Sequence, residues 1–477
     1  MSQSNENQPI FRDRISTVDD SGKRRWIYPK KPKGKWYTWR SIVSYILLLV
    51  LIILPFLKFQ GKPLFLLNVL ERKFIIFGMV FTPQDTHLFA IGMIALMLFI
   101  VFFTFVFGRL FCGWICPQTI FMEMVYRKIE YAIEGDAPAQ KRLNSQPWTT
   151  EKILKKTLKH FIFLVLAFFF ISLLLSLVVG IEEIFKVWSN PFSNTSLFIA
   201  ITAISLIFYF IFAFFREQVC TNVCPYGRMQ SVLLVDDSIV VHYDFLRGEK
   251  RASIKDRNKL IKAGEATEDE FGDCIDCGQC VAVCPTGIDI RNGTQLECIN
   301  CTACMDACDD VMAKIHKPTG LIRYSSEKSI KEGVPFKLPG RAKAYIGVLF
   351  VILALFVYMA SNRVAVEGII LRTPGMTYQY PQGDSTHILN VYNYKLINKT
   401  NTDLKNVEIK VKGFKDVDLK VIPEKIDVIP EFGRATGSMI LTIPVSEMKG
   451  YKTPVQFEIY SEGKLVHSPK TNFLGPH

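Results

Sequence analysis

The chain has 477 residues, of which 49% are hydrophobic, 13% aromatic and only 21% charged, and its formal net charge is +13. This apolar content excludes a disordered or fibrous chain, and the 37 Phe residues exceed what the core of a soluble enzyme of this size needs. The sequence therefore predicts a membrane protein.

Five stretches are long and apolar enough to cross a bilayer, which takes about 20 residues. They are 41–59, 86–107, 160–180, 195–215 and 343–361. We therefore expect an α-helical transmembrane bundle of five helices.

The distribution of Lys and Arg predicts the orientation of this bundle. Segments 1–40 and 108–159 carry ten and nine of these residues, whereas loops 58–85 and 181–194 carry four and one. By the positive-inside rule the N-terminus is cytoplasmic, so residues 216–342 lie inside and residues 362–477 outside. Because the basic residues are divided between compartments, we expect no nucleic-acid binding.

A short cysteine motif is repeated at the end of the second and fourth stretches. It reads C-x-x-x-C-P at Cys112 and Cys116 and again at Cys220 and Cys224. Positions i and i+4 share a helix face, so each motif should present two thiols together. Both stretches run inward, so four thiols should meet at the cytoplasmic edge of the membrane. Such a site suits Cu(I), an additional iron–sulfur cluster or a dithiol–disulfide pair.

The eight remaining cysteines form two runs of the pattern C-x-x-C-x-x-C-x-x-x-C, which is typical of bacterial ferredoxins. In proteins with two such runs, the fourth cysteine of each run ligates the cluster of the other. We therefore expect two 4Fe–4S clusters. The first would use Cys274, Cys277, Cys280 and Cys308, and the second would use Cys298, Cys301, Cys304 and Cys284.

Alternating polar and apolar residues begin at about residue 376 and continue to the end of the chain. The runs 390–397, 404–411, 425–429, 437–443 and 455–460 are separated by Gly, Pro and Asn. Several short strands within about 100 residues are typical of an immunoglobulin-like β-sandwich. No cysteine falls in this predicted outer domain, so the cysteines favour metal ligation over disulfide bonds.

These observations predict five regions: a cytoplasmic basic tail (1–40), a four-helix transmembrane region with the first C-x-x-x-C-P motif (41–215), a cytoplasmic region with the second motif (216–342), a fifth transmembrane helix (343–361) and an immunoglobulin-like domain (362–477). A two-cluster ferredoxin-like domain occupies about 265–320 of the cytoplasmic region.

With these motifs the chain resembles the FixG/RdxA/CcoG family of cytochrome oxidase accessory proteins. The resemblance rests on CGWICPQT at 112–119, CTNVCPYGRMQS at 220–231, IVVHYDFLRGEKR at 239–251, CPTGIDIRNG at 284–293 and CDDVM at 308–312. It covers nearly the whole chain.

The resemblance implies an oxidoreductase, a cupric reductase that converts Cu(II) to Cu(I) for assembly of the cbb-type cytochrome c oxidase. Cys112, Cys116, Cys220 and Cys224 would then be the catalytic, copper-handling positions or the ligands of an additional cluster. The implied location is the bacterial inner membrane, with residues 362–477 in the periplasm. The implied partners are copper ion, oxidase assembly factors or a copper transporter, an unidentified electron donor and a second copy in a homodimer.

Two other functions fit the same residues. The first is a quinol-linked redox relay to another membrane enzyme, with a third cluster at the membrane cysteines and no copper chemistry. The second is a non-catalytic scaffold for oxidase assembly, in which the β-sandwich binds the oxidase.

Overall fold

The computed structural model describes residues 17, 18, 21, 23–59, 61–68, 73–76, 79–81, 86–362, 366–381, 386–400, 402–414, 417–423, 426–431, 433–448 and 450–476. Residues 1–16 of the predicted basic tail lie outside this range. The chain divides into two compact units, one of Met1–Asn68 with Ile91–Leu353 and one of Val69–Ala90 with Ala354–His477.

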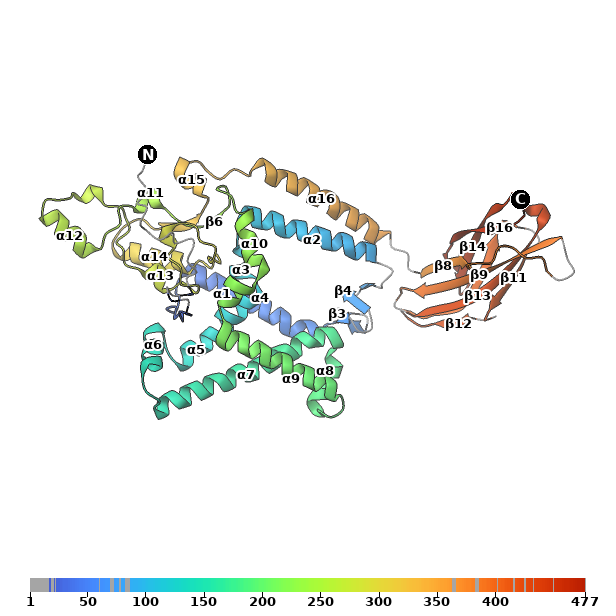
Figure 1. The fold of residues 1–477 in the computed structure, drawn as a ribbon, viewed down its shortest axis with the longest axis horizontal. Helices are drawn as coiled ribbons and strands as arrows, with labels where there is room; N and C mark the ends of the chain where they lie inside the picture. Colours follow the sequence, from blue (N-terminus) through green and yellow to red (C-terminus); the bar gives the residue numbers. More distant parts are fainter. Residues whose placement is uncertain are drawn as a thin grey trace. The chain divides into compact units, whose positions relative to one another are not determined.

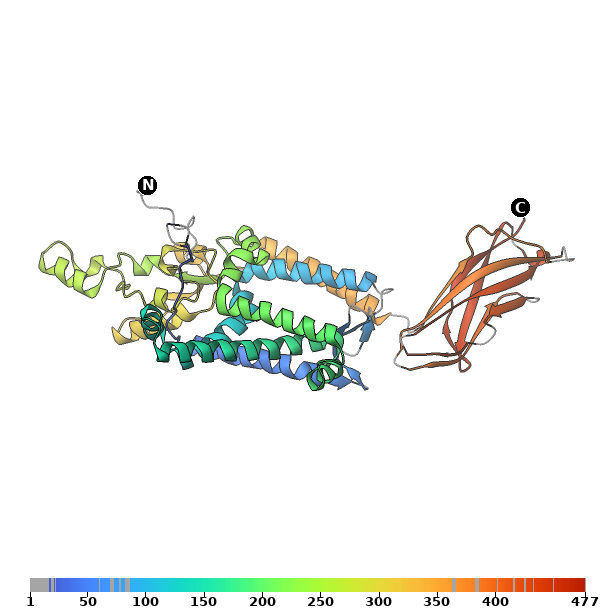
Figure 2. The same cartoon turned by 60° about the horizontal axis from the view of Figure 1, so that its bottom comes forward.

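Within the described residues, five helical segments are long and apolar enough to span a membrane: Lys35–Phe56, His87–Phe107, Thr150–Val179, Thr195–Phe215 and Gly340–Ser361. They contain helices α1 (Lys35–Ile53), α2 (Thr86–Phe107), α7 (Thr150–Val179), α9 (Thr195–Phe210) and α16 (Gly340–Ser361). Figure 2 shows α1, α2, α7 and α9, coloured blue to green, with their axes roughly parallel. Each of the five predicted apolar stretches therefore contains a long helix. The bounds predicted for the first, 41–59, are wrong, because its helix begins at Lys35 and residues Lys58–Phe59 form a strand.

Helix α7 begins ten residues before the predicted start at residue 160, so that predicted boundary is wrong. The side chain of Thr149 accepts a hydrogen bond from the Lys152 backbone N–H and caps the helix. The added turns are rich in Lys and contain Glu151, and both residue types favour helix. Because these turns are charged, their hydropathy is too low for them to be predicted as part of the membrane span.

Shorter elements connect the long helices. The helices are α3 (Leu110–Trp114), α4 (Pro117–Thr119), α5 (Arg127–Ile133), α6 (Ala137–Ser145) and α8 (Ile181–Ser189), with π-helical turns at Ile120–Tyr126, Ile211–Phe215 and Val219–Val223. The strands are β1 (Lys58–Phe59), β2 (Lys62–Pro63), β3 (Phe65–Asn68), β4 (Lys73–Ile76) and β5 (Met79–Phe81).

The cysteine-rich region consists of short elements around its own core (Figure 1). They are α10 (Pro225–Leu233), β6 (Val240–Tyr243), α11 (Phe245–Gly248), α12 (Ile254–Lys262), α13 (Gln279–Ala282), α14 (Ala303–Lys314), β7 (Ile322–Ser325) and α15 (Glu327–Glu332). Strands β6 and β7 are antiparallel, with Val241 opposite Tyr324. Val241, Ile288, Met305 and Leu321 are buried in the core beneath them.

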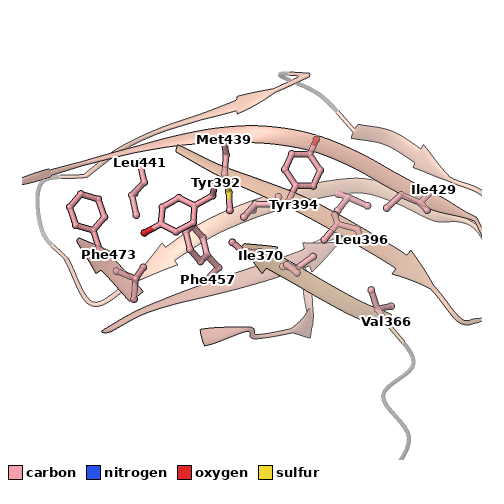
Figure 3. Close-up of a cluster of buried hydrophobic side chains, with 14 of the residues drawn as sticks. Val366, Ile370, Tyr392, Tyr394, Leu396, Ile429, Met439, Leu441, Phe457 and Phe473 are labelled. Atoms are coloured by element: carbon pink, nitrogen blue, oxygen red, sulfur yellow. The ribbon is translucent and has the colours of Figure 1, made fainter. Parts of the chain in front are cut away.

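The C-terminal region is a sandwich of two antiparallel sheets. One sheet has the order β11 (Asp418–Ile422), β13 (Arg434–Pro444), β9 (His387–Asn398) and β8 (Val366–Arg372). The other has the order β12 (Ile426–Ile429), β10 (Leu404–Lys412), β14 (Lys452–Ser461) and β15 (Lys464–His467), with β16 (Lys470–Leu474) also paired to β14. Figure 3 shows Tyr392, Met439 and Phe457 pointing toward one another between the sheets. The rings of Tyr392 and Phe457 meet edge to face with centroids 5.6 Å apart.

Apart from residue 425, which lies outside the described residues, the five predicted runs lie in β9, β10, β12, β13 and β14, so the predicted sandwich is confirmed. The alternating pattern, however, starts at Val366 and not near residue 376. The second inward position of β8 is Gly368, where a Cβ atom would lie 2.2 Å from Ile459 Cδ1. Because glycine has no apolar side chain, the alternation is interrupted at this position, and the strand was not predicted from the sequence.

Candidate metal centres

One pocket of the cysteine-rich region is lined by five thiols. Cys284, Cys298, Cys301 and Cys304 line it, and so does Cys280. The first four form the set predicted for the second cluster, which combines three cysteines of the second run with the last cysteine of the first run. The fold therefore brings these four side chains together.

The set predicted for the first cluster also converges. Cys308, the last cysteine of the second run, lies within electrostatic range of Cys280, Cys274 and Cys277. Burial raises the pKa of Cys308 to about 12, and the neighbouring thiols add to that effect. A thiol in this setting becomes a thiolate only when a cationic group compensates its charge.

The two runs share one backbone conformation around their central cysteines. Asp276 and Gly278 have φ of 51° and 66°, and the matching Asn300 and Thr302 have φ of 52° and 65°. A β-branched residue such as Thr302 rarely adopts positive φ. The left-handed residues precede α13 and α14 and turn the chain so that three thiols of each run face one side.

Within the described residues, no three Cys, His, Asp or Glu side chains lie close enough together to hold a single metal ion. Thiolates that share one zinc ion lie about 3.8 Å apart, given a metal–sulfur bond of about 2.3 Å and tetrahedral geometry. The cysteines of a 4Fe–4S cluster each bind a different iron, so they do not need this close spacing.

The four membrane cysteines also converge. Cys220 lies within electrostatic range of Cys116, Cys112 and Cys224, and Cys116 within range of Cys112 and Cys224. Burial raises the pKa of Cys220 to about 12, and the nearby Arg109 guanidinium opposes that rise. Two motifs more than 100 residues apart in sequence thus form one group of thiols.

The expectation that each motif presents its thiols on one regular helix face is wrong for the second cysteine. Cys116 (ψ 125°) and Cys224 (ψ 114°) are extended and precede α4 and α10. Each is followed by a proline, which disfavours the helical conformation in the residue before it. The helix therefore breaks at the same place in both motifs.

The membrane motif packs directly on the second ferredoxin run. Cys112 belongs to the same buried cluster as Ile299 and Cys301. A Cβ atom added to Gly113 would lie 2.3 Å from the Ile299 carbonyl oxygen, so only glycine permits this approach. The Trp114 indole donates to the Tyr324 hydroxyl at 3.2 Å. The two groups of cysteines are therefore neighbours.

Buried polar side chains surround the membrane thiols, and their contacts were not predicted from the sequence. Arg40 is 2% exposed and donates from Nε to the Gly113 carbonyl oxygen at 2.7 Å. The Gln230 side chain donates to Cys112 Sγ at 3.6 Å. Arg109 donates to the Leu296 carbonyl oxygen. Each partner is distant in sequence, so only the folded chain reveals these contacts.

A buried ionic network beside the thiols was also not predicted from the sequence. Arg216 donates from Nη1 and Nη2 to the two carboxylate oxygens of Glu130, at 3.2 and 2.5 Å. Lys159 lies 3.5 Å from Glu130, and Arg127 lies 2.7 Å from Glu123. Glu123 lies in the π-helical turn that precedes α5, and the other charges come from α5, α7 and the segment after α9, which their ion pairs hold together.

Three family models match the chain. A 4Fe–4S dicluster domain matches residues 215–327, a 4Fe–4S binding domain matches residues 89–133, and the "IG-like fold at C-terminal of FixG" matches residues 356–476. The chain therefore contains iron–sulfur domains and a FixG-type immunoglobulin-like domain.

Three curated proteins are similar to the chain. Nitrogen fixation protein FixG of Rhizobium meliloti is 36% identical over 64% of this chain and 58% of its own length. Protein RdxA of Cereibacter sphaeroides is 34% identical over 62% of each chain. Protein RdxB of the same organism is 30% identical over 93% of this chain and 95% of its own length.

The alignments thus span less than two thirds of FixG and RdxA and nearly all of RdxB. The RdxB alignment runs through the thiol motifs, both ferredoxin runs and the C-terminal sandwich. The chain belongs to the FixG/RdxA family of iron–sulfur proteins.

Proposed function

We propose that the protein is a membrane-bound electron-transfer protein that reduces Cu(II) to Cu(I) for assembly of a cbb-type cytochrome c oxidase. The observation that carries this proposal is that Cys112 and Cys301 belong to one cluster of buried, packed side chains. It joins a group of thiols suited to soft cations to a site suited to an iron–sulfur cluster.

The residues fit two 4Fe–4S clusters. Cys274, Cys277, Cys280 and Cys308 would hold one cluster, and Cys284, Cys298, Cys301 and Cys304 the other. When bound, these clusters supply one-electron transfer at potentials set by charge and hydrogen bonds around their sulfurs. Around the second set, Arg40 supplies positive charge and the apolar wall of Val241, Ile288 and Ile299 excludes water.

Copper is the substrate at the membrane thiols in this proposal. Because no three described thiols lie close enough to hold one ion, a Cu(I) ion would be held by two of Cys112, Cys116, Cys220 and Cys224. Their soft thiolates bind Cu(I) in preference to Cu(II). Preferential binding of the product makes reduction more favourable by the difference between the two binding free energies. Arg109, beside Cys220, balances part of the negative charge that four thiolates would carry.

The charge pattern supports a cytoplasmic N-terminus in the bacterial inner membrane. Both thiol motifs follow the C-terminal ends of candidate spans, so they would share the side of the ferredoxin domain. The β-sandwich follows the fifth candidate span and would lie in the periplasm. There it would meet oxidase assembly factors or a copper transporter.

One observation favours a second candidate function. The 4Fe–4S binding model at residues 89–133 contains Cys112 and Cys116 but none of the eight ferredoxin cysteines. A third cluster held by the four membrane thiols would make the protein a redox relay without copper chemistry.

Iron analysis and copper trapping separate the two functions. The wild-type protein is compared with a variant in which Cys112, Cys116, Cys220 and Cys224 are Ser. The copper proposal expects about eight irons in both proteins, from two four-iron clusters, and trapped Cu(I) only with the wild type. About twelve irons in the wild type, about eight in the variant, and no Cu(I) from either would establish the relay instead.

A further inference from the structure

A second cavity lies across strand β6 from the pocket of the second cluster. Side chains of a strand alternate between its faces. Val241 lines the cysteine pocket, whereas Val240 and His242 line this cavity of about 250 Å³. The complete wall consists of Leu234, Val235, Asp236, Ser238, Val240, His242, Thr294, Gln295, Leu296, Glu297 and Glu327. Only the thickness of one strand separates its contents from the cluster site.

A smaller cavity shares wall residues with both sites. It is lined by Cys298, Asn300 and Arg109. It also shares Leu234, Val240, Thr294 and Gln295 with the wall of the larger cavity. A ligand in the larger cavity would therefore lie close to a thiol assigned to the second cluster.

The larger cavity opens at the end of a candidate membrane span. Ser238 Oγ donates to the Phe105 carbonyl oxygen at 2.7 Å, and the Ile239 N–H donates to the Val106 carbonyl oxygen at 2.8 Å. Both carbonyls belong to the last turn of α2. The wall residues Leu296 and Val235 are 52% and 38% exposed, and Val232 beside them is 84% exposed. An apolar mouth at a membrane edge suits a ligand with a lipid tail.

The polar part of the wall limits the chemistry of the ligand. Asp236, Glu297 and Glu327 contribute carboxylates, and the described residues of this wall include no Lys or Arg. The wall itself therefore offers no cation to a phosphate-bearing donor such as a nicotinamide or flavin nucleotide, and the nearby Lys331 is already paired with Glu327 at 2.7 Å. A neutral ligand is favoured.

His242 is the polar group best placed to recognise such a ligand. Its side chain is 7% exposed and donates or accepts no hydrogen bond among the described residues. Glu327 lies within electrostatic range of it. Burial lowers the pKa of His242 despite the Glu327 charge, so its neutral imidazole can accept a hydrogen bond from a hydroxyl group.

We propose that this cavity binds a lipid-soluble hydroquinone, which donates electrons to the protein through the strand β6 wall. The inference rests on the proposed electron-transfer function. Oxidation breaks the two O–H bonds of the hydroquinone and yields quinone, two protons and two electrons. The protons pass to His242 and Glu327 and then to water, and the electrons reduce the two 4Fe–4S clusters by one electron each.

Binding is tested on the full-length, cluster-loaded protein in detergent with the fluorescent quinol analogue 2-heptyl-4-hydroxyquinoline N-oxide. The variants are His242→Gln and Leu296→Glu, the second of which changes only an exposed side chain at the mouth. The matched control is His316→Gln, because His316 is an exposed histidine of the same region. We expect quenching by the wild type and the control, and at least about tenfold weaker binding by both variants, as loss of one buried hydrogen bond or of the apolar mouth implies.

Reduction is followed in the same proteins from the cluster absorbance after addition of menadiol or dithionite. Menadiol should reduce the two variants at least about tenfold more slowly than the wild type, and dithionite should reduce all four proteins alike. The cavity assignment is overturned if the wild type does not bind the analogue, or if both variants bind it as tightly as the wild type does. A His242→Gln variant that binds the analogue as tightly as the wild type also overturns it. Failure of dithionite to reduce the wild type would overturn the electron-transfer function, while the binding result still decides the cavity.

Discussion

At the scale of single residues, the buried guanidinium of Arg40 lies between the two groups of cysteines. It hydrogen-bonds the carbonyl of Gly113 in the membrane motif and lies within electrostatic range of Cys301 in the second run. Burial raises the pKa of Cys301 to about 11, and Arg40 opposes this rise. Arg40 therefore stabilises negative charge at the second cluster site.

Replacement of Arg40 by Gln should lower the midpoint potential of the second cluster. A nearby positive charge favours the reduced, more negative state, so its removal should shift the potential by on the order of −60 mV, equivalent to ~1.4 kcal/mol for one electron. Arg40→Lys keeps the charge and is the matched control. An EPR-monitored redox titration measures both shifts, and an unchanged potential in Arg40→Gln would show that the charge does not act on the cluster.

At the scale of elements, the buried ionic network holds α5, α7 and the segment after α9 at the thiol site. Arg216 and Glu130 form a two-point pair, and both side chains are 4% exposed. Burial of Glu130 raises its pKa, but Arg216, Lys159 and Arg127 together lower it below the usual value. A buried pair that loses one partner leaves an uncompensated charge, which costs about 3–5 kcal/mol.

Glu130→Gln should therefore lower the free energy of unfolding by about 3 kcal/mol at neutral pH. The folded pKa of Glu130 is depressed. The ion pair of Glu130 therefore stabilises the folded state fully above the unfolded pKa of about 4.3, and this stabilisation is lost as the pH falls through the folded pKa. The wild type should lose more stability than the variant when acidified from pH ~6 to pH ~3. Thermal unfolding in detergent at the two pH values measures this loss of stability, and the exposed Glu151→Gln is the control. Equal acid sensitivity of the wild type and Glu130→Gln would contradict the account.

The docking of α3 on the second ferredoxin run gives another prediction. Gly113→Ala would place Cβ 2.3 Å from the backbone oxygen of Ile299, and the backbone must move to relieve the contact. Overpacking of this kind costs about 1–3 kcal/mol, and it would separate Cys112 from Cys301. Cu(I) formation should fall about tenfold or more while both clusters remain.

Gly347→Ala in α16, where a Cβ meets nothing within 4 Å, is the control and should behave as wild type. Unchanged Cu(I) formation in Gly113→Ala would show that this contact is not on the electron path.

Much of this fold is visible in the sequence because it depends on local patterns. Hydropathy predicts all five long helices, alternation predicts five strands of the sandwich, and cysteine spacing predicts which thiols meet. The remaining features depend on long-range partners. Arg40 and Glu130 carry no motif, and their roles exist only because Gly113 and Arg216 are folded against them.

At the scale of the whole molecule, the cysteine-rich region and the sandwich have separate cores. The core residues of the sandwich lie between Val366 and Phe473, and all twelve cysteines lie in the other compact unit. Truncation after Asn362 should therefore leave both cluster EPR signals and Cu(I) formation within about twofold of wild type. EPR spin counts and Cu(I) trapping test this. Loss of oxidase assembly in cells despite full redox activity would favour the scaffold function for the sandwich.

The central claim is that electrons pass from the ferredoxin clusters to copper at the four membrane thiols. The most direct test is a single-turnover reaction: reduce the clusters anaerobically, remove the reductant, add Cu(II), and count oxidised clusters and trapped Cu(I). The account predicts one Cu(I) for each cluster oxidised in the wild type, and clusters that stay reduced when Cys112, Cys116, Cys220 and Cys224 are Ser. Equal Cu(I) yields from both proteins would contradict it.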